Sequence, residues 1–419
     1  MKDYQNIKKG DYDVIVVGSG PAGIAAATMS GRMGAKTLII DACGSVGGIA
    51  TVGMMSHFTG TADSKFLREV YKRAAEKNVF APNEITVNIH HEMLKITYYE
   101  MLEEAGVDIL LYTLVTDTIM NGNAVKGVVV QNKSGTGAYF AKVVIDASGD
   151  GDVAYYAGAE FTLGRESDHK MQPATLMFQV GGVDMERAVF PPSFETTIET
   201  EKGELQSLAR EHLPHPCGHV LLYASTIPGI VTCNMTNIID VDGTKAEDLT
   251  KAEIVCRKQM LPIWRFLREF VPGYENCYII SGASLIGIRE TRHFKGLYTL
   301  TEDDIYKARH FDDAIAKGCH FNFDVHNISG SGLDKTGLQH EFKQQNGYDI
   351  PYGCIIPEKI DGLLLSGRNI SGTHMAHSNF RVMPICMAVG EACGVAAALA
   401  CKKNISPRNV DVQEIQQFI

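Results

Sequence analysis

Long apolar runs are missing from this sequence of 419 residues. The longest, Val14–Val17 and Val395–Ala400, are far shorter than the about 20 residues that a membrane-spanning helix needs. No apolar segment precedes Val14. We therefore expect neither a secretory signal nor a membrane span.

Cysteine pairs with metal-binding or redox spacing are also missing. The ten cysteines are scattered, and no two have the C-x-x-C spacing of a zinc ribbon, an iron–sulfur site or a dithiol centre. The sequence therefore predicts reduced thiols and a cytoplasmic location.

A histidine-rich segment, residues 212–219, is the strongest metal candidate in the sequence. Its candidate ligands are His212, His215, Cys217 and His219. Two prolines predict a loop here, and a zinc site would need all four side chains to converge. We therefore favour a solvated loop and expect no metal in the site.

Positive charge is scarce. The 39 lysines and arginines are outnumbered by 49 acidic residues, which gives a formal charge of −10. This balance disfavours binding to nucleic acid or to an anionic membrane. Glycine, in contrast, is abundant, with 41 residues against a usual share of about 7%. The positions of these glycines are the most informative feature of the chain.

A β-α-β pattern occupies residues 11–53. The apolar run 13–17 predicts a buried parallel strand, residues 24–34 predict a helix, and residues 37–40 predict a second strand. This order is typical of a dinucleotide-binding unit.

The turn after the first strand has the pattern Gly-x-Gly-x-x-Gly. Gly18 permits the tight turn, Gly20 lets the backbone approach a pyrophosphate, and Gly23 allows close helix–strand packing. Asp41 ends the second strand, where an acid accepts a hydrogen bond from a ribose hydroxyl. We expect the neighbouring residues Pro21, Ala22 and Ala42 to contact the cofactor as well.

A second glycine-rich run, residues 44–51, distinguishes FAD from NAD. It has no function in a simple NAD domain but suits a longer cofactor, and it resembles the double-glycine signature of glutathione-reductase-like flavoproteins. The expected FAD contacts in this run are Gly47, Gly48, Ile49 and Thr51.

Two further strand-to-turn segments agree with FAD. One strand, 143–146, ends in Ala147, Ser148 and Gly149, and another, 362–365, leads to Gly367 and Arg368. An arginine can pair with phosphate through two parallel hydrogen bonds. Strands are also expected at 107–115 and 125–131, with the backbone of Val115 near the adenine.

The flavin end is expected beside a helix over residues 385–401. A helix amino terminus carries partial positive charge, so Met383, Pro384 and Ile385 are expected to face the flavin. The preceding segment, 371–381, is expected to be a loop that passes the isoalloxazine. It carries His374 and His377, of which we expect at least one to be functional.

These motifs together resemble the bacterial FAD-dependent oxidoreductase family of the glutathione-reductase-like class, related to fumarate reductase flavoproteins. The matching segments are 18–27, 44–53, 146–152, 173–178, 287–292 and 351–398. The resemblance implies an α/β fold: a Rossmann-type FAD-binding domain, split in sequence, with a second α+β substrate domain built on a mixed β-sheet.

The expected domain boundaries follow from this division. The FAD-binding domain takes residues 11–60, 92–172 and 352–419, a helical cap over the flavin takes 61–91, and the substrate domain takes 173–351. Within the substrate domain we expect helices over 249–270, broken at Pro262, and over 303–317.

The resemblance implies hydride transfer between flavin N5 and a small organic substrate. Either an activated C=C is reduced, or an alcohol or amine is oxidised. His374 or His377 is the expected general acid or base, and Arg381 or Arg289 the group that orients the substrate. Arg289, Thr291 and His293 would share one face if this segment were a strand.

Several alternatives stay open. The chain could be the flavoprotein subunit of an electron-transfer complex, or a non-redox flavoprotein. A diffusible electron carrier or oxygen could complete the reaction, and a homo-oligomer is open. FAD is expected to bind non-covalently, although His57 could lie near its dimethylbenzene edge.

Overall fold

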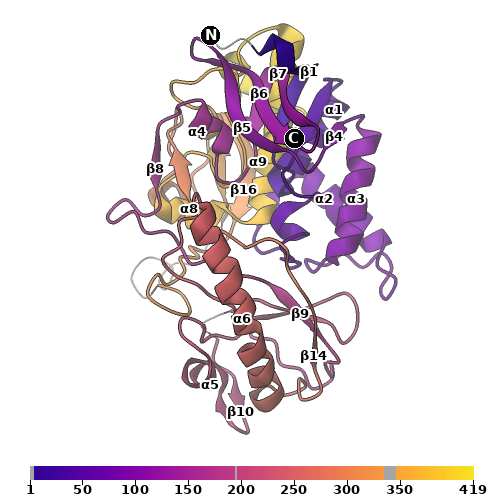
Figure 1. Ribbon diagram of the computed structural model, residues 1–419, viewed down its shortest axis with the longest axis vertical. Helices are drawn as coiled ribbons and strands as arrows, with labels where there is room; N and C mark the ends of the chain where they lie inside the picture. Colours follow the sequence, from indigo (N-terminus) through magenta and orange to yellow (C-terminus); the bar gives the residue numbers. More distant parts are fainter. Residues whose placement is uncertain (1–3, 194–195, 335–345) are drawn as a thin grey trace.

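A twisted seven-stranded sheet forms the upper part of the molecule, near both chain termini (Figure 1). The computed structural model describes residues 4–193, 196–334 and 346–419. The strand order is β4-β2-β1-β7-β6-β5, and β18 lies beside the end of β7. The strands are β1 (Lys8–Val17), β2 (Thr37–Ile40), β4 (Asp108–Leu110), β5 (Leu114–Asn121), β6 (Ala124–Asn132), β7 (Gly135–Asp146) and β18 (Leu363–Leu365).

The parallel strands of this sheet form its buried centre. β1 pairs in parallel with β2 and β7, β2 with β4, and β7 with β18, while β5 and β6 add antiparallel pairings at the other edge. The last four residues of β1 and all of β2 and β18 are buried, as expected for strands covered on both faces.

The sequence predicts one strand over residues 107–115, but the structure has two strands in this region. Residues 107–115 divide into β4 and the start of β5, because Tyr112 adopts a positive φ of 53° that extended backbone does not allow. The expected β-α-β unit is present, with α1 (Pro21–Arg32) between β1 and β2.

Helix α9 (Met383–Lys403) packs directly on α1. A Cβ on Gly390 would lie 2.1 Å from the carbonyl oxygen of Ala22, and one on Gly394 would lie 2.3 Å from that of Ala26. The helix is long and apolar enough to cross a membrane, but its most apolar window is completely buried inside the fold. It is therefore the central core helix of this domain.

Replacing Gly390 with alanine is expected to lower the free energy of unfolding by about 2 kcal/mol, because the added methyl group forces α1 and α9 apart. Alanine is otherwise favoured over glycine inside a helix by about 1 kcal/mol, so helix propensity acts in the opposite direction. Urea unfolding followed by circular dichroism measures the change. A variant as stable as the wild type would contradict the close packing described.

A small antiparallel sheet and two helices complete this part. β16 (Ala314–His320) pairs with β17 (Tyr348–Pro351) and with β3 (Thr61–Asp63). The helices are α2 (Lys65–Glu76) and α3 (His91–Glu104), and α2 packs on α9. The other short elements are α4 (Asp152–Tyr156), β8 (Phe161–Leu163), β15 (Arg292–Phe294) and α10 (Val412–Gln416).

The expected helix over 303–317 is wrong. A capping box between Thr301 and Asp304 starts α7 (Glu302–Tyr306), but the helix ends there, and Ala308 has a positive φ of 47°. The following residues form β16, whose partner β17 lies some thirty residues further along the chain. Pairing with this distant strand overrides the local helical pattern.

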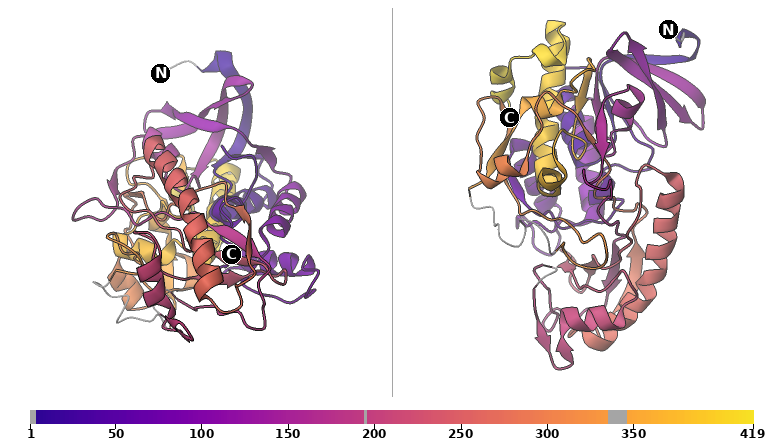
Figure 2. Two further views of the ribbon diagram at one scale, coloured as in Figure 1. Left: turned by 60° about the horizontal axis from the view of Figure 1, so that its bottom comes forward. Right: turned by 90° about the vertical axis from the view of Figure 1, so that its left-hand side faces the viewer.

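The lower part contains a second sheet and a long helix that runs along one side of it (Figure 2, right). The sheet order is β12-β13-β9-β14, and every pairing is antiparallel rather than mixed as we expected. The elements are β9 (Phe178–Gly181), β12 (Leu222–Ala224), β13 (Val231–Cys233), β14 (Tyr278–Gly282), the hairpin β10 (Glu199–Thr200) and β11 (Gly203–Glu204), α5 (Leu205–His212) and α6 (Ala246–Phe270). Residues 225–230 join β12 to β13, a connection too short for a parallel crossover.

Two corrections concern this part. Helix α6 is continuous through Pro262, so the expected break is absent. A separate hydrophobic core is built from buried residues within 174–283, whereas Ile315, Tyr348 and Ile350 pack into the core around the large sheet. Part of the segment that we assigned to the substrate domain therefore belongs structurally with the first core.

Candidate functional site

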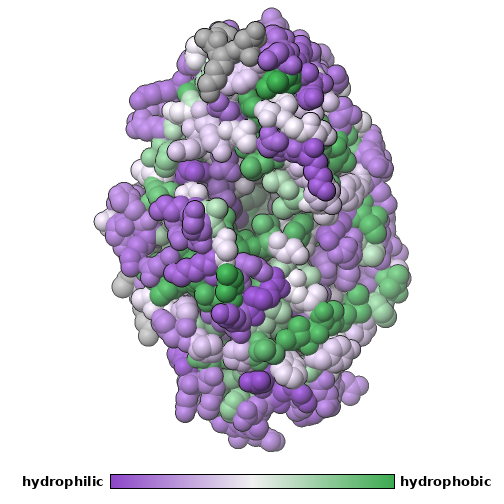
Figure 3. Space-filling view, in the orientation of Figure 1, coloured by the Kyte–Doolittle hydropathy of each residue, from purple (hydrophilic) through white to green (hydrophobic). Residues whose placement is uncertain are grey.

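A cavity of about 1050 Å³ lies between the glycine turns of the large sheet and the second sheet. A hollow near the middle of one face, with apolar residues around it, is visible in Figure 3. The wall near the large sheet carries turns and small residues, and the wall near the second sheet carries apolar and polar side chains.

The first glycine turn forms one end of the cavity. Gly18 has a φ of 96°, and a Cβ there would lie 2.3 Å from the carbonyl oxygen of Ala147. A Cβ on Gly23 would lie 1.9 Å from the oxygen of Gly18, so Gly23 serves packing and does not line the cavity. Gly20 differs, because a Cβ there would meet no atom within 4 Å and would enter the cavity. This open cradle at the start of α1 fits a pyrophosphate.

Asp41 also lines the cavity, at the end of β2. Its Oδ2 accepts hydrogen bonds from the backbone N–H and the hydroxyl of Ser19, both at 2.6 Å, and its Oδ1 accepts from the N–H of Cys43 at 2.7 Å. These bonds fix the carboxylate at the position where an adenosine ribose is expected.

The second glycine run, residues 44–51, packs against the first glycine turn, residues 18–23. Gly47, with a φ of 101°, donates from its N–H to the oxygen of Ser19 at 2.7 Å, and Thr51 donates to the oxygen of Val46 at 2.5 Å. A Cβ on Gly48 would lie 3.0 Å from the Cα of Gly20. The two loops therefore approach each other through glycine backbone, and Gly48 and Ile49 line the cavity.

The turns that follow β7 and β18 form a further part of the cavity wall. Arg368 donates from Nη2 to Oδ1 of Asp150 at 3.0 Å, while its buried Nη1 has no hydrogen-bond partner among the described residues. Arg368, Asp150 and Gly149 all line the cavity. A buried guanidinium nitrogen without an acceptor fits an anionic phosphate at this point.

Thirteen of the predicted cofactor residues line the cavity. They are Gly18, Gly20, Pro21, Ala22, Asp41, Gly48, Ile49, Ala147, Ser148, Gly149, Gly367, Arg368 and Met383. Seven do not line it, namely Gly23, Ala42, Gly47, Thr51, Val115, Pro384 and Ile385. Cys43, Asp150, Ser366 and Cys386 line it and were not predicted, although each lies within two residues of a predicted contact or in the predicted helix.

Another part of the cavity wall, which we call its polar end, carries a group of polar side chains from distant segments. Arg381 donates from Nη2 to Oδ2 of Asp324 at 2.8 Å, and His326 Nε2 lies 3.4 Å from the same oxygen. Arg289 donates from Nη1 to the oxygen of Pro173 at 2.5 Å. Within the described part of the chain, no carboxylate forms a salt bridge with Arg289, which leaves most of its guanidinium for a ligand.

Burial and the two arginines shift the pKa values of the titratable groups at this end of the cavity. Burial, and then the charge of Arg381, lowers the pKa of Arg289 to about 10, so it remains charged at neutral pH. Burial, and then Arg289, lowers the pKa of His326 to about 4, so this imidazole is neutral. Burial would raise the pKa of Asp324, but His326 and Arg381 hold it below its usual value.

Tyr223 and His57 complete this end. Their rings stack with centroids 4.6 Å apart, and both line the cavity. Tyr223 accepts a hydrogen bond from Nδ2 of Asn234 at 3.2 Å, and among the described residues no acceptor takes its O–H, which can therefore donate to a ligand. Burial raises the pKa of Tyr223 to about 12. His57 Nδ1 lies 2.7 Å from Oδ1 of Asn88.

His374 and His377 lie elsewhere. Residues 374–380 form helix α8 (His374–Phe380) rather than the expected loop, because the Thr373 side chain accepts from the N–H of Ala376 and starts a helix. Both histidines are buried, and neither lines the cavity. The sequence signal for this difference is Thr373, a favourable helix-capping residue.

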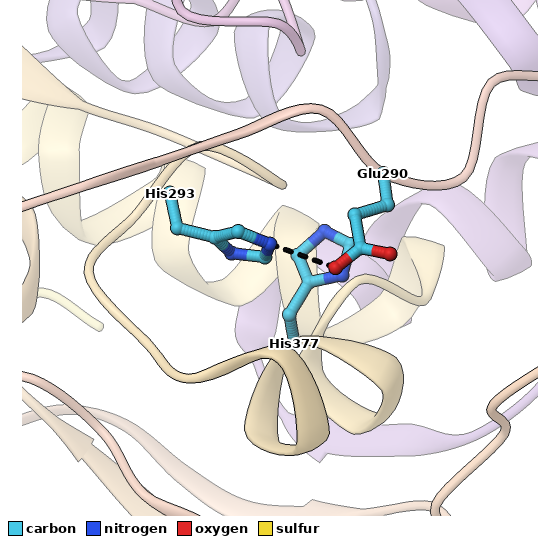
Figure 4. Close-up of side chains that lie close together, drawn as sticks. All are labelled: Glu290, His293 and His377. Carbon is cyan, nitrogen blue, oxygen red and sulfur yellow. Dashed lines mark hydrogen bonds and ion pairs between the residues drawn. The ribbon is translucent and has the colours of Figure 1, made fainter. Parts of the chain in front are cut away.

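The two histidines instead gather around a buried acid, Glu290. Its Oε1 accepts from His293 Nε2 at 2.8 Å and lies 2.5 Å from His374 Nδ1. His377 points toward the same group from α8 (Figure 4). Burial raises the pKa of Glu290, but the hydrogen bonds from His293 and His374 outweigh burial and hold it well below its usual value.

The expected strand alternation at 289–293 is also wrong. Strand β15 begins only at Arg292, so Arg289, Thr291 and His293 do not share a face. Thr291 donates to Oδ1 of Asp150 at 2.8 Å, Arg289 lines the cavity, and His293 bonds Glu290. Among the described residues, the segment 212–219 contributes to no group of side chains close enough to hold a metal ion.

A buried histidine near the cavity makes stability depend on pH. Burial, and then the neighbouring His326, lowers the pKa of His219 to about 3, and its Nε2 donates to the oxygen of Asn234 at 3.2 Å. The unfolded chain, with a histidine pKa of about 6.5, binds more protons than the folded chain between these values, so stability falls as the pH falls. At pH 5 we expect the loss from this residue to be about 2 kcal/mol.

The His219→Gln variant checks this expectation. Urea unfolding at pH 7 and at pH 5 should show a smaller loss of stability on acidification in the variant than in the wild type. The exposed Leu297 provides the control, because Leu297→Gln changes no group that titrates between pH 5 and pH 7. Equal pH dependence in wild type and His219→Gln would contradict a neutral buried imidazole.

The parallel sheet with glycine turns and the acid at the end of β2 define a Rossmann-type flavoprotein. The family model described as FAD dependent oxidoreductase matches residues 13–419, so the chain belongs to this family, and FAD is its cofactor. The predicted family, the Rossmann-type FAD-binding fold and the cofactor are thereby confirmed. The assignment to the glutathione-reductase-like class and the kinship with fumarate reductase flavoproteins remain predictions.

Known relatives share parts of the chain. Digeranylgeranylglycerophospholipid reductase 1 of Methanococcoides burtonii is 28% identical over 201 residues, which make up 43% of this chain and 47% of that protein. A tRNA uridine 5-carboxymethylaminomethyl modification enzyme of Clostridium botulinum is 30% identical over 183 residues, 36% of this chain and 27% of that protein. The chain thus spans less than half the length of these two curated relatives.

One solved structure covers almost the whole chain. A geranylgeranyl bacteriochlorophyll reductase-like protein from Thermoplasma acidophilum aligns over 98% of this chain and 82% of its own, with a TM-score of 0.51 and 16% identity. This likeness supports the fold.

Proposed function

We propose that this flavoenzyme transfers a hydride between flavin N5 and a small organic substrate that carries a carbonyl or carboxylate group. The observation that carries the proposal is that two arginines and a tyrosine line the same cavity as the glycine turns of the FAD cradle. When bound, FAD supplies the hydride acceptor or donor.

The FAD contacts that we propose are the residues that line the cavity at its glycine end. The backbone at Gly20 and the amino terminus of α1 would hold the pyrophosphate, with Arg368 as a second phosphate contact. Asp41 would accept from the ribose. The amino terminus of α9, at Met383, would face the flavin. We propose non-covalent binding, because the stacked and hydrogen-bonded ring of His57 is held by Tyr223 and Asn88.

Substrate orientation is assigned to Arg289 and Arg381. Arg289 is the more available of the two, because Arg381 is already paired with Asp324. A planar guanidinium binds a carboxylate or carbonyl in a defined direction and desolvates with less cost than an ammonium group. Asp324 would position Arg381 and limit the net positive charge at this end.

We propose Tyr223 as the proton donor or acceptor for the substrate oxygen or carbon. Its hydroxyl lies on the cavity wall with Asn234 donating to it, whereas His374 and His377 are screened from the cavity. The neutral imidazole of His326 is the second titratable group on this wall. The role that we expected for His374 and His377 therefore passes to Tyr223 or His326.

The experiment is an anaerobic screen of the FAD-loaded protein. The oxidised enzyme is mixed with alcohols and amines, and the dithionite-reduced enzyme with enoates and enones, while the flavin absorbance is followed. Bleaching or reoxidation by one compound class supports hydride transfer and sets its direction. If no compound changes the flavin absorbance and a one-electron carrier does, the electron-transfer subunit is the better assignment.

We place the protein in the cytoplasm, because all ten cysteines are free and nine of them are buried. A diffusible carrier or oxygen would complete the redox cycle. Neither nucleic acid nor a membrane surface is a proposed partner.

A further inference from the structure

A buried group of one acid and three histidines lies beside the cavity without lining it. The group consists of Glu290, His293, His374 and His377, and each is at most 4% exposed. Side chains of this kind rarely gather in a core without a partner of opposite charge or a metal ion. Its members come from three places, the segment before β15, β15 itself and helix α8.

Three members of the group are arranged as ligands around one point. One ligand atom each from Glu290, His293 and His377 lies within 4.8 Å of the other two. Ligand atoms bound at about 2.1 Å to a single ion lie within about 4.2 Å of one another. Figure 4 shows the three side chains close together, and a small inward movement would bring all three into contact with one ion.

An unsatisfied nitrogen points to a missing partner. His377 Nδ1 is buried and has no hydrogen-bond partner in the described part of the chain, and its ring meets His293 edge to face at 4.6 Å between centroids.

The surroundings of Glu290 match those of a metal-ligating carboxylate. Its Oε2 accepts from the N–H of Gln172 at 3.1 Å, and His374 Nδ1 lies 2.5 Å from its Oε1. In metal sites, hydrogen-bond partners that do not touch the metal hold a ligating carboxylate in its orientation. His374 would therefore stay a hydrogen-bonding neighbour and not a ligand.

We propose that Glu290, His293 and His377 bind one divalent transition-metal ion, Zn²⁺ or Fe²⁺. Two imidazoles and a carboxylate are a ligand set that both ions accept. The ion would fasten α8 to the segment that precedes β15. Glu290 follows Arg289, and His377 lies one helical turn before Arg381, so the ion would hold in place the two arginine-bearing segments of the cavity. The proposal departs from our expectation of no metal and does not depend on the substrate assignment.

Metal analysis of the FAD-loaded protein is the direct test. After growth with zinc, iron and manganese supplied, plasma mass spectrometry of the purified protein is expected to show about one equivalent of zinc or iron. His377→Gln and Glu290→Gln should reduce this content at least about tenfold, because lost ligands weaken binding strongly. His91→Gln, a buried histidine of α3 outside the group, should keep the metal. A wild type without metal, or variants with full metal content, would overturn the proposal.

A second measurement does not depend on whether the variants fold. Chelator-treated wild-type protein, still loaded with FAD, is mixed with Co²⁺ or Zn²⁺, and its melting is followed by near-ultraviolet circular dichroism. Site binding should raise the melting temperature by several degrees and give a Co²⁺ difference spectrum with visible ligand-field bands. If neither the melting temperature nor the spectrum changes, Glu290 and the histidines form a hydrogen-bond network only.

Discussion

Gly20→Asp is expected to give a folded protein that no longer retains FAD. Gly20 is the N-cap of α1, with a φ of −67° that every residue adopts, and a Cβ there meets no protein atom within 4 Å. Aspartate is a favourable N-cap, so the helix should form. Its carboxylate, however, would occupy the cradle, accept from the free N–H groups of the first turn and repel the pyrophosphate.

The expected loss in FAD affinity is at least about 100-fold, or ~2.7 kcal/mol. It is measured by the ratio of flavin to protein absorbance after purification and by titration of the stripped protein with FAD. Gly20→Asn is the matched variant, because it has nearly the same size and capping ability without the charge, and it should lose less affinity. Circular dichroism and melting should match those of stripped wild-type protein.

Two outcomes would count against this interpretation. Full flavin retention in Gly20→Asp would mean that the pyrophosphate does not approach Gly20. An unfolded Gly20→Asn would mean that the space beside Gly20 is occupied by protein. Gly23 provides the contrast, since a Cβ there would lie 1.9 Å from the oxygen of Gly18 and would disturb the fold itself.

The cofactor end of the site could be predicted from the sequence because its determinants are local. The spacing of Gly18, Gly20 and Gly23 between two apolar runs specifies a turn, a helix start and a close approach within a few residues. Asp41 follows from the same unit. Gly47 and Thr51 show the limit of this reasoning. Both are predicted FAD contacts, but their hydrogen bonds stabilise the second glycine loop and neither residue lines the cavity.

The substrate end could be predicted only in part, since it is assembled from distant segments. Arg289 and Arg381 were identified by residue type, and both line the cavity. Tyr223 is not among the predicted site residues, because nothing near it in the sequence indicates that His57 stacks on it. The sequence predicts a loop that carries His374 and His377 beside the flavin, whereas a helix turns them toward Glu290. Contacts between residues so far apart leave no local pattern.

The same limit explains the errors in the fold. Residues 314–320 form a strand only because β17 and β3 lie on either side of them, and neither partner is near in sequence. A propensity for helix is worth a few tenths of a kcal/mol per residue, which is less than the pairing and burial that replace it.

Arg289→Met is expected to lower the rate of flavin reduction or reoxidation by the substrate found in the anaerobic screen, with FAD retained. Arg289 lies on the cavity wall with one hydrogen bond, from Nη1 to the oxygen of Pro173, and no salt bridge within the described residues. Its remaining donors would bind the substrate oxygen. Loss of a charge-assisted pair should reduce kcat/KM about 100-fold, or ~2.7 kcal/mol.

The control variants separate this role from a structural one. Arg289→Lys keeps the charge but not the planar fork, so it should recover only part of the activity. Arg187→Met removes the exposed pair with Glu275 in the same part of the molecule and should leave kcat/KM as it is. Replacement of this half-buried arginine by methionine should not lower the melting temperature, because it also removes a partly desolvated cation. Unchanged kcat/KM in Arg289→Met would assign the substrate to Arg381 alone, and a large loss of FAD would place Arg289 at the cofactor instead.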